Sequence, residues 1–283
     1  MIKKYLSISF LALFVLLGFA CEEVAPILNP TDGTTGGGGP VSTQQRQVVI
    51  EEFTGVRCVN CPAASEAIAA LVGVYGERLV PVAIHAGFFA VPYPESADAG
   101  LETSTGGAIL TFLGEPLGFP TAVVNRRNFD GEENRQVVQN TWAGYIAEEL
   151  AQDPTVRIDL NSAYNDATGN VDIEADLYID ENIDFEDVRL TVYITESNIT
   201  ATQLTPAGVD EDYKHKHAFR TVVTATEGDI INESLTAGSV ITRNLSVTLD
   251  PSWVAAECDI VAIVHQGGAV LDVIQAHQVP VIE

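Results

Sequence analysis

Two cysteines three positions apart, Cys58 and Cys61, are the residues of this chain best placed to do chemistry. An apolar, β-branched run precedes them and an alanine-rich pattern follows, which predicts a strand, a turn and then a helix. At the start of a helix, unpaired N–H groups and the positive dipole end stabilise the thiolate of the first, more exposed sulfur. We therefore predict that Cys58 is a nucleophile, that Cys61 is the resolving thiol and that the two close a disulfide.

Two other interpretations of this pair stay open. The pair can be half of a structural zinc site, although zinc prefers four ligands and the chain offers no second pair of this kind. It can also be a purely structural disulfide, although so small a ring constrains the unfolded chain little. Arg57, directly before Cys58, is expected to add to the stabilisation of the thiolate and to contact substrate.

The first 21 residues are typical of an export signal rather than of a folded element. Lys3 and Lys4 precede an apolar run at residues 5–17, and residues 18–20 have the small-x-small pattern of a cleavage site. Cys21 follows directly, which resembles a bacterial lipobox. The resemblance implies that Cys21 carries the lipid, for example palmitate, and that the anchor holds the mature protein at the membrane. The alternative is ordinary signal peptidase cleavage before Cys21. We predict an outer-membrane lipoprotein of the cell envelope, periplasmic or surface-exposed.

The remaining chain is long enough for two domains behind a tether. Residues 22–46 are rich in Pro, Gly, Ser and Thr without apolar periodicity, and are predicted to be a flexible linker. The net charge of −25 makes nucleic acid an unsuitable partner. The first domain is expected at residues 47–152 and the second at residues 153–283.

The expected first domain alternates between strand and helix patterns. After the dithiol comes a helix that ends at Gly76, and then a buried strand at residues 79–89. A partly helical segment follows at residues 97–113. Pro120 then enters a short strand, a position at which the proline is expected to be cis. Residues 134–151 are expected to form a helix that places Val137, Val138, Trp142, Ile146 and Leu150 on one face.

This order of elements resembles a thioredoxin fold. In that family a cis-proline beside the dithiol grips the substrate backbone, which implies this role for Pro120, with Phe119 and Thr121 contacting substrate beside it. The family also has a buried carboxylate six residues before the first cysteine, where it assists proton transfer at the resolving thiol. Here that position is Glu52, a glutamate in place of the usual aspartate; the alternative is a glutamate that faces solvent.

In residues 153–283 the hydrophobic period changes to two. About seven short strands with Asn, Asp and Gly turns between them predict an immunoglobulin-like β-sandwich. Cys258 lies in one of these apolar runs and is expected to be buried and inert. His215 and His217 share one face of an extended strand; a packing contact is expected, with chelation of a metal as the alternative.

Three motifs together identify the chain as similar to the outer-membrane-protein 28 family of Bacteroidota lipoproteins. They are Glu-Glu-Phe-Thr-Gly-x-x-Cys-x-x-Cys-Pro from Glu51, Pro-Thr-x-x-x-Asn-Arg from Pro120 and Tyr-x-His-x-His-x-x-Arg from Tyr213. The function predicted from the dithiol is thiol–disulfide oxidoreductase, acting on protein thiols or disulfides of the cell envelope without cofactor or metal. The alternative is a surface binding or adhesion lipoprotein that uses the same fold as a scaffold.

Overall fold

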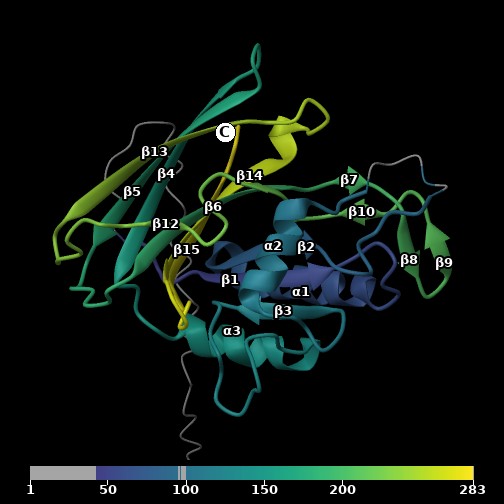
Figure 1. Ribbon diagram of the computed structural model, residues 1–283, viewed down its shortest axis with the longest axis horizontal. Helices are drawn as coiled ribbons and strands as arrows, with labels where there is room; N and C mark the ends of the chain where they lie inside the picture. Colours follow the sequence, from purple (N-terminus) through teal and green to yellow (C-terminus); the bar gives the residue numbers. More distant parts are fainter. Residues whose placement is uncertain (1–42, 95, 97–99, 283) are drawn as a thin grey trace, which may run out of the picture. The chain divides into compact units, whose positions relative to one another are not determined.

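The computed structural model describes residues 43–94, 96 and 100–282. The predicted leader, Cys21 and most of the predicted linker lie outside these residues. The helices of the described residues are all too short or too polar to cross a membrane. Strands outnumber helices, so the protein is mostly β (Figure 1).

The elements up to residue 150 form a parallel pair of strands with helices around it. They are β1 (Val48–Thr54), α1 (Cys61–Tyr75), the 3-10 turn η1 (Gly76–Arg78), β2 (Leu79–His85), α2 (Ser104–Leu113), β3 (Thr121–Val124), η2 (Gln139–Thr141) and α3 (Trp142–Leu150). β1 runs parallel to β2 and antiparallel to β3. Every residue of β1 is buried, because strands lie on both sides of it and helices cover the sheet.

Two boundaries differ from those predicted from sequence. β2 ends at His85 rather than at residue 89. The last helix of this part begins at Trp142 rather than at residue 134. Val137 instead exchanges backbone hydrogen bonds with Ala122 in an isolated bridge, and Val138 is exposed. The apolar spacing at residues 134–141 resembled that of a helix because Val137, which forms the bridge, is also buried.

The regular elements after residue 155 are strands, apart from one 3-10 turn. Its elements are β4 (Val156–Asn165), β5 (Asn170–Ile179), β6 (Val188–Glu196), β7 (Ile199–Thr200), β8 (Gln203–Thr205), β9 (Gly208–Asp210), β10 (Lys214–His215), β11 (Ala218–Val222), β12 (Asp229–Ile230), β13 (Val240–Thr248), the 3-10 turn η3 (Ala255–Glu257), β14 (Cys258–Gln266) and β15 (Val273–Pro280).

One large sheet contains strands from both halves of the chain. Its order is β15-β14-β6-β11-β2-β1-β3, with β12 also pairing with β6. The junction is between β2 and β11, which run parallel with Ala83 opposite Ala218. A second sheet, in the order β13-β5-β4, is separate. The described residues belong to one compact unit, and the expected boundary near residue 152 does not interrupt the large sheet.

Three apolar clusters fill the interior. The first lies between the β13-β5-β4 sheet and one face of β6, β14 and β15, as in a β-sandwich. The second joins the opposite face of these strands to β1, β2 and α2. The third lies under α1 and α3, where Trp142 and Ile146 are completely buried. The second cluster binds the two halves of the chain together, because it takes apolar side chains from each.

A buried ion pair of the first half of the chain is bonded to the second half through Tyr193 of β6. The Arg126 guanidinium donates two hydrogen bonds of 2.9 Å to the Glu51 carboxylate, and both side chains are fully buried. It also donates to the Tyr193 hydroxyl at 2.8 Å, which in turn donates to Glu51. Burial alone lowers an arginine pKa, but the charge of Glu51 and these bonds raise the pKa of Arg126. The ion pair therefore joins β1 to the loop that follows β3, and the Tyr193 hydroxyl bonds β6 to both.

Candidate functional site

The two cysteines lie where the end of β1 turns into α1. Gly55 is required in this turn, since a Cβ there would come within 2.4 Å of the Phe89 backbone. The Cys58 amide donates to the Gly55 carbonyl at 3.0 Å, which turns the chain toward the helix. Cys61 is the first helical residue, and Cys58 lies just before the helix. The strand, turn and helix predicted around the pair are confirmed.

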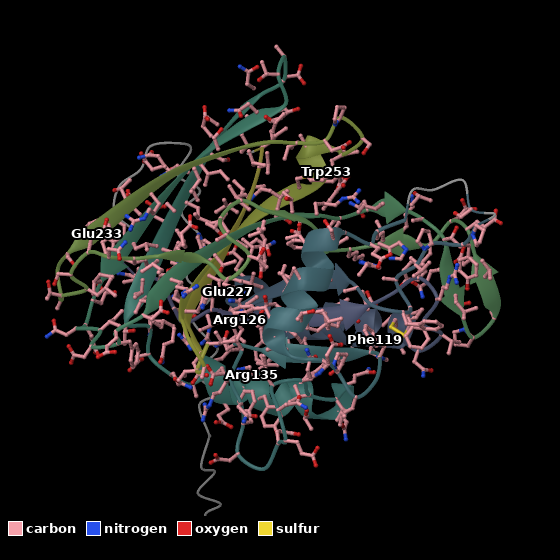
Figure 2. All side chains as sticks on the ribbon, in the orientation of Figure 1. Phe119, Arg126, Arg135, Glu227, Glu233 and Trp253 are labelled. Carbon is pink, nitrogen blue, oxygen red and sulfur yellow. A yellow bond between two sulfur atoms is a disulfide. The ribbon has the colours of Figure 1, made fainter. Side chains whose placement is uncertain are left out.

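Cys58 and Cys61 form a disulfide with an S–S distance of 2.11 Å (Figure 2, yellow bond). The expected difference in exposure between them is wrong. Cys58 is 3% exposed and Cys61 2% exposed, so neither sulfur is presented at the surface. The reason lies in the second half of the chain, where residues 199–215 lie over the dithiol turn. We call residues 199–215 the cover segment.

The cover segment is attached to the dithiol turn by backbone and side-chain hydrogen bonds. The Leu204 amide donates to the Val56 carbonyl at 2.7 Å. The Gln203 side-chain amide donates to the Cys58 carbonyl at 3.1 Å, and Gln203 is 2% exposed. The two legs of the segment, β7 and β10, pair with each other, and β8 and β9 form the hairpin between them (Figure 1). The segment therefore closes the site from one side.

The second titratable group of the site is Glu52, which is buried rather than facing solvent. Neighbouring residues of a strand point to opposite faces, so Glu51 faces Arg126 and Glu52 faces the dithiol side. The cross-strand neighbours of Glu52 are Ala83 and Ala122, whose small side chains leave room for a carboxylate. Its Oε1 has no hydrogen-bond partner among the described residues. Burial raises the pKa of Glu52 to about 8.

A small cavity lies between Glu52 and the resolving cysteine. It is lined by Glu52, Cys61, His85, Tyr213 and His215, among others. Its volume of about 10 Å³ is room for roughly one water molecule, with polar groups around it. Cys61 and the Glu52 side chain therefore line one small cavity. The proton-transfer role that the resemblance to thioredoxin implies for Glu52 stays a prediction.

The residues predicted to contact substrate lie in different environments and make different contacts. The Phe119–Pro120 peptide bond is cis, as predicted, and both residues are half-buried. Thr121 is buried and its hydroxyl donates to the Val137 carbonyl at 3.0 Å, so this hydroxyl points away from any substrate. The Arg57 guanidinium donates to the Pro92 carbonyl and lies over the Tyr93 ring, 4.9 Å from its centroid. Arg57 thus holds the loop after β2.

A groove runs along the outer face of α1 beside the proline loop. Its volume is about 790 Å³, and its walls include Asn60, Ala63, Ala67, Pro120 and Val138. Most of these side chains are small and apolar, which leaves a smooth surface. Asn60 lies between the two cysteines in sequence, so the groove reaches the dithiol turn.

Sequence reasoning missed two residues of the site, His85 and Gln203. His85 was included in an apolar strand, and Gln203 lies in a segment without periodicity. The motif around His215 was noticed, but its partner was not. His215 packs against His85, with ring centroids 5.2 Å apart, while His217 adopts a positive φ of 52°. No group of three or more metal-ligating side chains is present among the described residues.

These features define a mostly β type of protein with a buried Cys-X-X-Cys disulfide beside a buried carboxylate. The chain belongs to the family of outer membrane protein Omp28, whose family model matches residues 115–281. The predicted family is therefore confirmed, and with it the outer membrane as location. The matched residues include the proline loop and the cover segment but begin after the dithiol. No curated protein matches the chain.

Solved structures share the fold. HBP35 of Porphyromonas gingivalis has a TM-score of 0.68 and 21% identity, over 84% of this chain and 76% of that one. A structural genomics target from Agrobacterium tumefaciens has a TM-score of 0.53 and 17% identity, over 86% of this chain and 97% of that one. At these identities the similarity concerns the fold alone.

Proposed function

We propose that this protein is a membrane-anchored thiol–disulfide oxidoreductase of the cell envelope. The observation that carries the proposal is the cavity lined by both Cys61 of the disulfide and Glu52, a buried carboxylic acid with a pKa of about 8. A structural disulfide needs no titratable group beside it. Perturbed pKa values of this kind cluster at functional sites.

In the proposed reaction the reduced pair transfers two electrons to a substrate disulfide. The Cys58 thiolate attacks one substrate sulfur, and the other substrate sulfur leaves as a thiolate that takes a proton from solvent. Cys61 then loses its proton to the ionised form of Glu52, attacks the Cys58 sulfur and displaces the second substrate thiolate, which takes a proton from solvent. The products are the Cys58–Cys61 disulfide and two substrate thiols. Run backwards, the same steps oxidise substrate thiols.

The remaining parts have roles in this proposal. Residues 47–152 act as a thioredoxin-like domain, and residues 153–283 as an immunoglobulin-like sandwich that shares its sheet. An extended, apolar segment of a protein substrate lies in the groove along α1, against Phe119 and Pro120. Arg57 shapes the neighbouring loop. The lipid on Cys21 holds the site at the outer membrane.

The reduction potential of the pair tests the proposal. Equilibration with reduced and oxidised glutathione, followed by alkylation with a mass tag, measures the fraction of disulfide; a Cys58→Ser variant identifies the tagged species. A transition between about −270 and −120 mV is expected, as in working oxidoreductases. A pair that stays oxidised below about −300 mV is a structural staple and refutes the proposal.

One observation favours the alternative, a binding lipoprotein with a fixed disulfide. Cys58 is only 3% exposed, because the cover segment lies over it. Reaction with a protein substrate therefore requires the cover segment to open. Reduction of a protein disulfide such as that of insulin separates the two functions: catalysis above the rate of the Cys58→Ser variant supports the oxidoreductase, and equality supports the scaffold.

A further inference from the structure

The cover segment brings a second set of titratable side chains to the dithiol cavity. His85 lies at the end of β2, and His215 comes from β10, 130 positions further along the chain. Both line the same cavity as Glu52 and Cys61. Neither histidine has a role in the reaction as described above.

The rings of these residues form a continuous series toward the surface. The centroids of His85 and His215 are 5.2 Å apart, and those of His215 and Tyr213 are 4.8 Å apart, each pair edge to face. His85 is 3% exposed and His215 5% exposed, whereas Tyr213 is half-buried and Lys216 is exposed. The series therefore begins beside Glu52 and ends at solvent.

The proposed reaction needs a route by which protons pass between Glu52 and solvent. Glu52 is 2% exposed, so a proton that it takes from Cys61 has no direct contact with bulk water. Its Oε1 and the Nδ1 of His85 are both buried with no hydrogen-bond partner among the described residues. The cavity between them has room for about one water molecule, which can bond to both.

We propose that His85 and His215 relay the proton of Glu52 to solvent at the Tyr213 edge of the cover segment. This inference rests on the proposed function. The proton leaves the Cys61 thiol as Cys61 attacks the mixed disulfide, resides on Glu52, and passes through the cavity and the two imidazoles to water. No electron moves in this step. Glu52 returns to its carboxylate and accepts the next proton.

The surroundings of His85 favour its neutral form, which can relay a proton. Burial, together with His215, moves the pKa of His85 well below its usual value, and Arg220 acts in the same direction. Lys216 faces the same cavity, and Glu66 and Asp210 act on Tyr213. A neutral imidazole accepts a proton on one nitrogen while it releases one from the other. It can therefore pass a proton on without holding a positive charge in the interior.

Closure of a glutathione mixed disulfide isolates the step in question. The reduced protein is mixed with oxidised glutathione, quenched with acid at intervals and analysed by mass spectrometry, which separates the Cys58–glutathione adduct from the closed disulfide. The variants are His85→Gln and His215→Ala. The matched control is His277→Gln, a half-buried histidine of β15 that bonds to Gln47. Each variant is measured with and without added imidazole, and its reduction potential is determined.

We expect both relay variants to close the adduct about 10-fold or more slowly, below the 10²–10⁴-fold typical of direct proton transfer. Imidazole is expected to restore closure in His215→Ala, with the reduction potential unchanged in every variant. Closure as fast as in His277→Gln overturns the relay. So does slow closure that imidazole does not rescue and that comes with a shifted potential, which indicates a structural role.

The two proposals fail in different measurements. Glutathione is a small molecule, so closure can be followed whether or not a protein disulfide is a substrate. If both relay variants close the glutathione adduct slowly but the wild-type protein does not reduce insulin, the proposed function as a protein oxidoreductase is refuted and the relay is kept. Insulin reduction with relay variants as fast as His277→Gln keeps the function and refutes the relay. A pair that glutathione and dithiothreitol leave oxidised refutes both.

Discussion

The burial of Glu52 predicts a stability that falls as pH rises, and Glu52→Gln should remove this dependence. The pKa of the carboxyl group is about 8 in the folded protein and 4.5 in its ordinary state. The folded protein therefore binds the proton more tightly, so the stabilisation is complete below pH 4.5 and is lost as pH rises toward 8. Linkage over that interval gives a loss of about 3–4 kcal/mol in the free energy of unfolding between pH 5 and pH 8. Glutamine keeps the shape of the neutral acid and does not titrate.

Urea unfolding of the oxidised protein, followed by tryptophan fluorescence at several pH values, measures this effect. Other groups titrate in the same range, so the informative quantity is the difference between Glu52→Gln and wild type. We expect this difference to grow by about 3–4 kcal/mol in favour of the variant from pH 5 to pH 8. The control is Glu77→Gln, an exposed glutamate of η1, for which the difference should stay constant. A constant difference for Glu52→Gln as well means that the carboxylate is ionised or hydrated, and refutes our description of the site.

Three further predictions concern the packing around the dithiol. Gln203→Ala removes hydrogen bonds that hold the cover segment, about 1–2 kcal/mol, so reduction of Cys58 by dithiothreitol should accelerate about 5–30-fold; an unchanged rate contradicts the covering role. Glu51→Gln should cost about 3–5 kcal/mol in urea unfolding because it leaves the Arg126 charge buried without its partner, whereas a loss below 1 kcal/mol contradicts this. Burial, with the charge of Glu196, raises the pKa of Cys258 to about 12, so alkylation at pH 8 should label Cys258 only after denaturation, as mass spectrometry can show.

Local patterns were sufficient to predict the dithiol part of the site. The apolar run of β1, the glycine turn and the alanine-rich start of α1 each have a short-range signal, and they place the cysteines correctly. The cis bond before Pro120 agrees with the cis-proline that the resemblance to thioredoxin implied. The burial of Glu52 was left open from sequence, because a glutamate in a strand has two faces available. What decides it is the identity of its cross-strand neighbours, Ala83 and Ala122, which depends on register.

The features that sequence could not supply all depend on contacts between distant segments. Cys58 was expected to be the exposed sulfur, since a helix N-terminus is usually open to solvent. The cover segment closes it through bonds from Gln203 and Leu204, which lie about 145 positions away and carry no periodic signal. The pairing of His85 with His215 is equally non-local. Such contacts between distant segments decide burial, and local sequence patterns do not show them.

The shared sheet gives these long-range contacts a common physical cause. β11 pairs with β2 directly beside the strand that carries Glu52, so the chain that leads into β11 must pass the end of β2 and the dithiol turn. The cover segment is that chain. A second domain joined only by a linker would leave the dithiol open. Here the second half of the chain continues the same sheet and places its own side chains over Cys58 and beside Cys61. In this protein the part of the chain that matches the family model thus controls access to a dithiol that lies outside the match.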